Sequence, residues 1–148
     1  ILLKAKQFST EHIRNRVSER FLAHGIEPSR LLLEGVSPRN EYLASYSRVD
    51  IQLDTFPFPG GTITAESLWM GVPVLTMSGR HFLERQGAGL LISAGMPDWV
   101  AEDAESYVAL AVKRSANLDA LAHLRRRLRT LRVGKPYSPP PPTSRRTA

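Results

Sequence analysis

Residues 49–76 read VDIQLDTFPFPGGTITAESLWMGVPVLT and decide the fold. The apolar run at residues 49–53 predicts a buried β-strand. Proline and glycine then predict a loop at residues 56–61, and the pattern of residues 62–70 predicts a helix. A second apolar run, at residues 72–76, predicts another strand. A strand, a helix and a strand in immediate succession are typical of a parallel sheet.

The flanking sequence continues this alternation of short strands and amphipathic helices. Apolar runs predict further strands at residues 1–3 and 31–33. Ser37 is expected to cap a helix that begins at Pro38. Other helices are predicted at residues 11–23, 82–94, 104–115 and 118–131. We therefore expect one α/β domain over residues 1–133, a Rossmann-like parallel sheet with helices on both faces.

The composition excludes several classes of protein. With 42% hydrophobic and 23% charged residues, the chain is typical of a globular domain. No apolar run approaches the roughly 20 residues that span a bilayer. The chain has no cysteine, and its four histidines lack a metal-ligand spacing, so we expect no metal site. It opens without a methionine or a signal peptide, and we expect it to be part of something longer.

The positive charge is concentrated near the carboxyl end. Eight of the 20 lysines and arginines and none of the 14 acids follow Leu124, so the preceding residues are nearly neutral. Residues 134–148 are rich in proline and are predicted to form a disordered basic tail. Such a tail can bind nucleic acid, anionic lipid or an SH3-type partner, but we interpret it as a solvated end without a specific nucleic acid partner.

A ligand site is predicted where the loop enters the helix. Gly60 and Gly61 leave backbone amides unobstructed, and Thr62 adds a hydroxyl at the same place. The first turn of a helix carries a partial positive charge and suits a phosphate group. The alternative is an ordinary turn that needs glycines, and the loop alone does not decide between the two interpretations.

Glu66 favours the ligand. On a helical wheel it lies on the face of Thr62, away from a small polar arc formed by Thr64, Ser67 and Gly71, and we expect it to be partly buried. A buried carboxylate needs a partner, which is either a basic side chain or the hydroxyls of a ribose. Elsewhere the evidence is weaker: Asp54 at a strand end is either catalytic or, as we favour, a turn cap.

Residues 50–77 resemble the C-terminal catalytic lobe of the O-linked N-acetylglucosamine transferase/SPINDLY family, glycosyltransferase family 41. The family pattern there is roughly A-D-x-x-L-D-T-x-P-x-N-G-x-T-T-x-x-[DE]-x-L-W-x-G-x-P-[VM]-[VL]-T. Looser similarity extends to residues 36–42 and 79–91, so that about residues 1–131 are covered.

The resemblance implies a GT-B fold whose C-terminal lobe holds the donor. It implies transfer of N-acetylglucosamine from UDP-GlcNAc to Ser or Thr hydroxyls of a protein acceptor, in the cytoplasm, without a metal and with no membrane partner. By position in the motif, Gly61, Thr62 and Ile63 would bind the pyrophosphate, Ile63 through its backbone only. Glu66 would hold the ribose, and Ser37 and Arg39 would lie by the base. Gly60 is assigned to the same donor site. No residue is assigned a catalytic role.

Four positions depart from the family pattern. Pro59 replaces an Asn, Ile63 replaces the second Thr, and Gly61 and Tyr42 stand where the animal enzymes have His. The family's N-terminal lobe, its tetratricopeptide repeats and an upstream lysine are also expected in a full-length protein. Two alternatives therefore stay open: a non-catalytic nucleotide-binding or scaffold lobe, and another GT-B transferase such as an N-glucosyltransferase.

Overall fold

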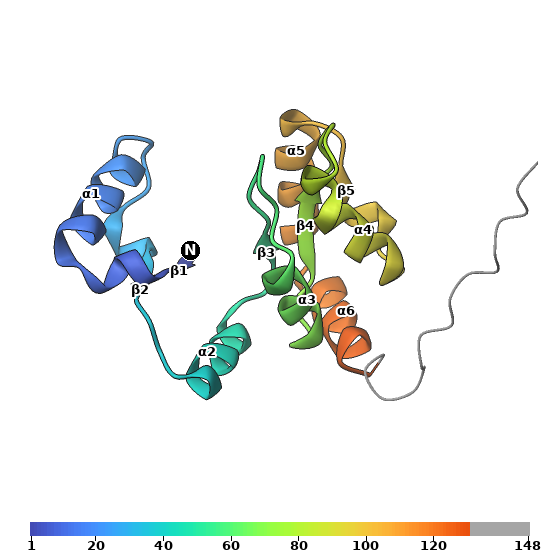
Figure 1. Cartoon of the computed structure of the whole chain (residues 1–148), viewed down its shortest axis with the longest axis horizontal. Helices are drawn as coiled ribbons and strands as arrows, with labels where there is room; N and C mark the ends of the chain where they lie inside the picture. The colour runs from blue at the N-terminus through green and yellow to red at the C-terminus, as the bar shows by residue number, and fades with distance from the viewer. Residues whose placement is uncertain (131–148) are drawn as a thin grey trace, which may run out of the picture. The chain divides into compact units, whose positions relative to one another are not determined.

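In the computed structural model of the chain, residues 1–130 are described (Figure 1). They divide into two compact units, Ile1–Val49 and Asp50–Ala148, the second described as far as residue 130. Both units combine parallel strands with helices, which confirms the predicted α/β class. One lobe over residues 1–133 stays a prediction, and the predicted tail at 134–148 lies outside the described residues.

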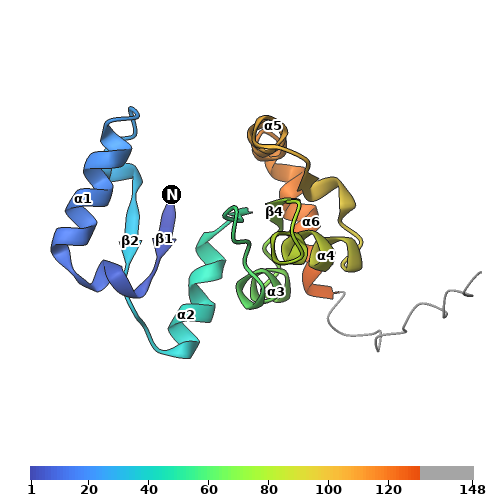
Figure 2. The ribbon, with the colours of Figure 1, turned by 45° about the horizontal axis from the view of Figure 1, so that its top comes forward.

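Unit 1 is built on two parallel strands. Leu2 lies opposite Leu32 in the register of this pair, and α1 lies beside the strands (Figures 1 and 2). Its elements are β1 (Leu2–Lys4), η1 (Lys6–Ser9), α1 (Glu11–Leu22), η2 (Pro28–Arg30), β2 (Leu32–Glu34), α2 (Arg39–Ser45) and η3 (Tyr46–Arg48). Here η denotes a 3-10 helix.

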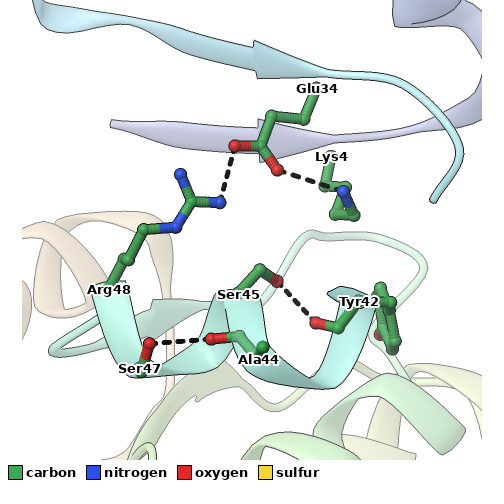
Figure 3. Close-up of polar contacts among 7 residues, drawn as sticks. All are labelled: Lys4, Glu34, Tyr42, Ala44, Ser45, Ser47 and Arg48. Atoms are coloured by element: carbon green, nitrogen blue, oxygen red, sulfur yellow. Dashed lines mark hydrogen bonds and ion pairs between the residues drawn. The ribbon is translucent and has the colours of Figure 1, made fainter. Parts of the chain in front are cut away.

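A carboxylate joins three elements of this unit (Figure 3). Glu34 at the end of β2 accepts hydrogen bonds from Lys4 Nζ at 3.0 Å and from Arg48 Nη2 at 2.6 Å. The hydrogen bond from Arg48, followed by the one from Lys4, lowers the pKa of Glu34. The pair β1–β2 is thereby tied to η3.

The predicted start of α2 is wrong by one residue. Its N-cap is Pro38, with φ −53° and ψ 154°, and the first helical residue is Arg39. Ser37 is therefore too far from the first free amides to cap the helix, and its buried Oγ has no hydrogen-bond partner among the described residues. Pro38 cannot begin the helix because its ψ is extended.

Unit 2 holds a three-stranded parallel sheet in the order β3-β4-β5. Figure 2 shows α3, α4 and α5 arranged around β4, and all three contact it. The elements are β3 (Gln52–Leu53), α3 (Thr62–Trp69), β4 (Val74–Met77), η4 (Leu83–Arg85), α4 (Gln86–Ser93), η5 (Pro97–Trp99), β5 (Val100–Ala101), α5 (Ala104–Ser115) and α6 (Leu118–Thr130). The core residues buried most deeply are Val74, Leu75 and Leu91.

Two predictions for this unit need correction, and one strand was not predicted. The strand predicted at residues 49–53 is confined to β3, and the helix predicted at 82–94 divides into η4 and α4. The strand β5 was not predicted, because two residues are too few to show an alternating pattern. In the described part of the chain, no helix is long and apolar enough to cross a membrane.

The face of α3 that points inward is the small polar one. Thr64 and Ser67 are completely buried, whereas Trp69 is 59% exposed. Ser67 Oγ donates a hydrogen bond to the side chain of Gln52 in β3. Small side chains let the helix approach the sheet closely, and the buried hydroxyl of Ser67 is satisfied by a polar strand residue. Packing at this face therefore overrides simple hydrophobic patterning.

Candidate functional site

The site lies at the carboxyl ends of β3 and β4, where ligands bind in open α/β sheets. The chain leaves β3 at Asp54 and enters a loop that contains a cis Phe56–Pro57 peptide bond. Thr55 Oγ1 closes the loop by donating to the carbonyl of Phe58 at 2.9 Å. The loop then delivers Gly60 and Gly61 to the start of α3.

The first turn of α3 presents backbone amides. Gly61 is the N-cap, and as a glycine it has no side chain with which to cap the helix. The amide of Ala65 donates to the carbonyl of Gly61 at 3.1 Å, so the amides before it have no intrahelical acceptor. Together with the helix dipole they form a positive end that suits a phosphate group.

Five of the seven predicted site residues come together here. Gly60 and Gly61 are half-buried, and Thr62 and Ile63 are exposed at the helix start. Glu66 follows one turn later and is half-buried, as expected. Their roles toward a ligand stay predictions.

The other two predicted residues belong to unit 1. Ser37 lies in the segment between β2 and α2, and Arg39 is the first residue of α2. The guanidinium of Arg39 lies 5.7 Å from the ring centroid of Tyr42 and stacks over that ring. The contact of Ser37 and Arg39 with a nucleotide base stays a prediction.

Asp54 connects the loop to the strand β4 through hydrogen bonds. Its side chain is buried, Oδ1 accepts a hydrogen bond from the Gly60 amide at 2.7 Å, and Oδ2 accepts one from Thr76 Oγ1 at 2.8 Å. Burial raises the pKa of Asp54, and the hydrogen bonds from Gly60 and Thr76 oppose that rise. Asp54 is thus the turn cap that its position after a strand predicted.

Two further residues, Tyr107 and Gly87, contact Asp54, and the sequence predicts neither contact. The hydroxyl of Tyr107 in α5 donates to the backbone carbonyl of Asp54 at 2.7 Å, and burial together with the charge of Asp54 raises the pKa of Tyr107 to about 12. A Cβ placed on Gly87 in α4 would lie 2.6 Å from Asp54 Oδ2 and 2.5 Å from Thr76 Oγ1. Only glycine fits there without movement of its neighbours.

Residues 2–138 match Glycosyl transferase family 41. The chain belongs to this family. It is 38% identical over 137 residues to the Arabidopsis thaliana protein named "Probable UDP-N-acetylglucosamine--peptide N-acetylglucosaminyltransferase SPINDLY". It is 32% identical over 124 residues to the UDP-N-acetylglucosamine--peptide N-acetylglucosaminyltransferase of Caenorhabditis elegans. These alignments cover 92% and 84% of this chain.

A solved structure supports the same assignment. A mutant (K341M) of the Thermobaculum terrenum O-GlcNAc transferase superposes with a TM-score of 0.83 at 35% identity, over 87% of this chain and 25% of that one. This family 41 chain spans 15% of the length of the Arabidopsis protein and 10% of the nematode one. It corresponds to part of such proteins.

A second loop follows β4 in this family 41 chain. Glu84 Oε2 accepts hydrogen bonds from the amides of Arg80 and His81, at 2.8 and 3.1 Å, and these bonds lower the pKa of Glu84. Arg85 Nε donates to the carbonyl of Gly79 at 3.0 Å. Glu84 and Arg85 therefore shape the turn into α4.

No metal centre is formed within residues 1–130. No three His, Asp or Glu side chains in this range gather as a metal ion requires. The amides of the first turn of α3 supply a partial positive charge at the loop.

Proposed function

We propose that this chain is the donor-binding part of a glycosyltransferase that transfers N-acetylglucosamine from UDP-GlcNAc to Ser or Thr hydroxyls of proteins. Its membership of family 41 and the names of its relatives support the reaction class. We propose that the full-length protein also contains the N-terminal lobe and the tetratricopeptide repeats, and that it acts on a protein acceptor.

The observation that carries this proposal is the open amino end of α3. The amides of Gly61 and Thr62 have no intrahelical acceptor and would meet the charge of a diphosphate without a counter-ion, which supports metal-independent binding. The half-buried Glu66 stands one turn further along the same helix. A carboxylate there is well placed to accept hydrogen bonds from the ribose diol, as acidic residues do in dinucleotide folds.

Electrostatics define what this part of the enzyme contributes. When the sugar is transferred, negative charge develops on the departing diphosphate, and fixed backbone dipoles stabilise it without reorganisation. We propose that α3 provides this stabilisation, and that Ile63 contributes only its backbone amide because its side chain has no donor. We also propose a cytoplasmic location, since a chain without cysteine requires no oxidising compartment.

Titration calorimetry of the full chain with UDP and with GDP tests the proposal. We expect UDP to bind, and Glu66→Ala to weaken the binding at least tenfold, because hydrogen bonds to a charged group contribute about 1.5–3 kcal/mol. Glu19→Ala, on an exposed part of α1, removes the same charge in unit 1 and should leave the affinity unchanged. Equal affinity of the Glu66→Ala variant and the wild type would contradict the ribose role, and absence of binding at millimolar UDP would contradict the proposed function.

A further inference from the structure

We propose that Asp54 is the positioning residue of the donor site, which holds the Gly60–Gly61 loop in the shape that receives a diphosphate. This inference rests on the proposed function and adds a residue to it. Asp54 lies six residues before Gly60 in the chain, and its side chain accepts the Gly60 hydrogen bond across the whole loop.

The side chain of Asp54 has no surface to offer a ligand. The residue is only 4% exposed, and each carboxylate oxygen already accepts a hydrogen bond, Oδ1 from the Gly60 amide and Oδ2 from Thr76. It therefore acts through the loop and touches neither substrate nor leaving group. What it fixes is the direction of the Gly60 amide, which points inward to Oδ1.

The hydrogen bond from Gly60 also anchors the point from which the chain enters α3. A peptide group is planar, so this hydrogen bond fixes the whole Pro59–Gly60 peptide group and with it the Gly60 Cα. Gly61 comes next and is the N-cap of α3. The same anchor therefore sets the position of the first-turn amides, which have no intrahelical acceptor and would bind the diphosphate.

Asp54 also sets the spacing between α3 and α4. Gly87 in the first turn of α4 packs directly against Asp54 Oδ2 with no room for a side chain. On the other side of the loop, a Cβ placed on Gly61 would lie 3.3 Å from Oε1 of Gln86, the first residue of α4. The amino ends of α3 and α4 thus meet beside the loop, with Asp54 beneath them.

The test compares three variants of the full chain by calorimetry with UDP and by thermal unfolding. Asp54→Ala removes both hydrogen bonds and should weaken UDP binding tenfold or more. Asp54→Asn keeps an oxygen that accepts from Gly60, and should restore the affinity to within about threefold of the wild type. Leu121→Ala in the core of unit 2 should lower the Tm without changing the affinity.

These outcomes separate positioning from simple stabilisation. If Leu121→Ala loses as much affinity as Asp54→Ala at a similar Tm, Asp54 is only structural and the inference is overturned. The inference alone is overturned if Asp54→Ala binds UDP like the wild type. If the wild type itself binds no UDP, the proposed function fails first, and the role of Asp54 in donor binding fails with it.

A measurement on the wild type covers the case in which Asp54→Ala does not fold. The amide proton of Gly60 should exchange slowly with solvent for a loop residue, because it is bonded to a buried carboxylate. An exchange rate like that of the exposed amides of the same loop would overturn the inference.

Discussion

Asp54 keeps a carboxylate out of water at the end of β3, and the raised pKa of this group reflects the desolvation that accompanies its burial. Two hydrogen bonds, from Gly60 and Thr76, reduce that cost. Glu66 is a different kind of acid, because it is half-buried beside an open helix end. The first acid shapes the loop, and we propose that the second binds the ligand.

The burial of Asp54 predicts a pH dependence of stability. Its folded-state pKa is raised above the ordinary value of 3.8, so the folded protein binds more protons than the unfolded chain between these two values. The free energy of unfolding of the wild type should therefore fall, relative to that of Asp54→Asn, as the pH rises from about 3.8 through the folded-state pKa. Urea unfolding of both proteins at a series of pH values measures this difference. A difference that is constant with pH would contradict it.

At the scale of elements, small residues determine how the helices of unit 2 dock. Thr64 and Ser67 bring α3 against the sheet, and Gly87 brings α4 against Asp54. These contacts place two helix amino ends at one edge of the sheet. The docking depends on small side chains at the contacts, and hydrophobic periodicity does not predict these positions.

Two glycines of α4 provide a matched test of this docking. Gly87→Ala should destabilise the protein by about 1–3 kcal/mol, because the new methyl group would overlap Asp54 and Thr76. Gly89→Ala, in the same helix, meets no atom within 4 Å and should stabilise the protein by about 0.5–1 kcal/mol. Denaturant unfolding measures both. Equal effects of the two substitutions would contradict the close packing at Gly87.

The sequence predicts an element well when the interactions that form it join residues close together in the chain. The predicted bounds of α5 agree with the structure, because its apolar spacing and its cap at Asp103 are local signals. The start of α2 and the strand β5 were not predicted correctly, since they depend on a backbone angle at Pro38 and on pairing with β4.

The same distinction holds for the candidate site. Gly60, Gly61 and Glu66 are recognisable because they occur within one short motif. The contacts of Asp54 with Thr76 and Tyr107 join residues 22 and 53 positions apart, and local patterns carry no trace of such pairs. These contacts follow only from the three-dimensional arrangement of the sheet and its helices.

At the scale of the whole molecule, the chain belongs to glycosyltransferase family 41. It covers 15% of the Arabidopsis relative and contains, in unit 2, the loop and helix that we propose to bind the donor. The groups that receive the sugar are proposed to lie elsewhere in the full-length protein. Binding without transfer is therefore the activity that we propose for these 148 residues.

The most direct measurement of donor binding is an NMR titration of the ¹⁵N-labelled full chain with UDP. We predict that the amide resonances of Gly60, Gly61, Thr62 and Ile63 shift in a saturable manner. Those of Gly25 in unit 1 and Gly95 after α4 should stay unchanged. Donor binding at α3 would be contradicted if the resonances of the loop and α3 amides did not shift at millimolar UDP, or if the shifts were confined to the arginine-rich helix α6.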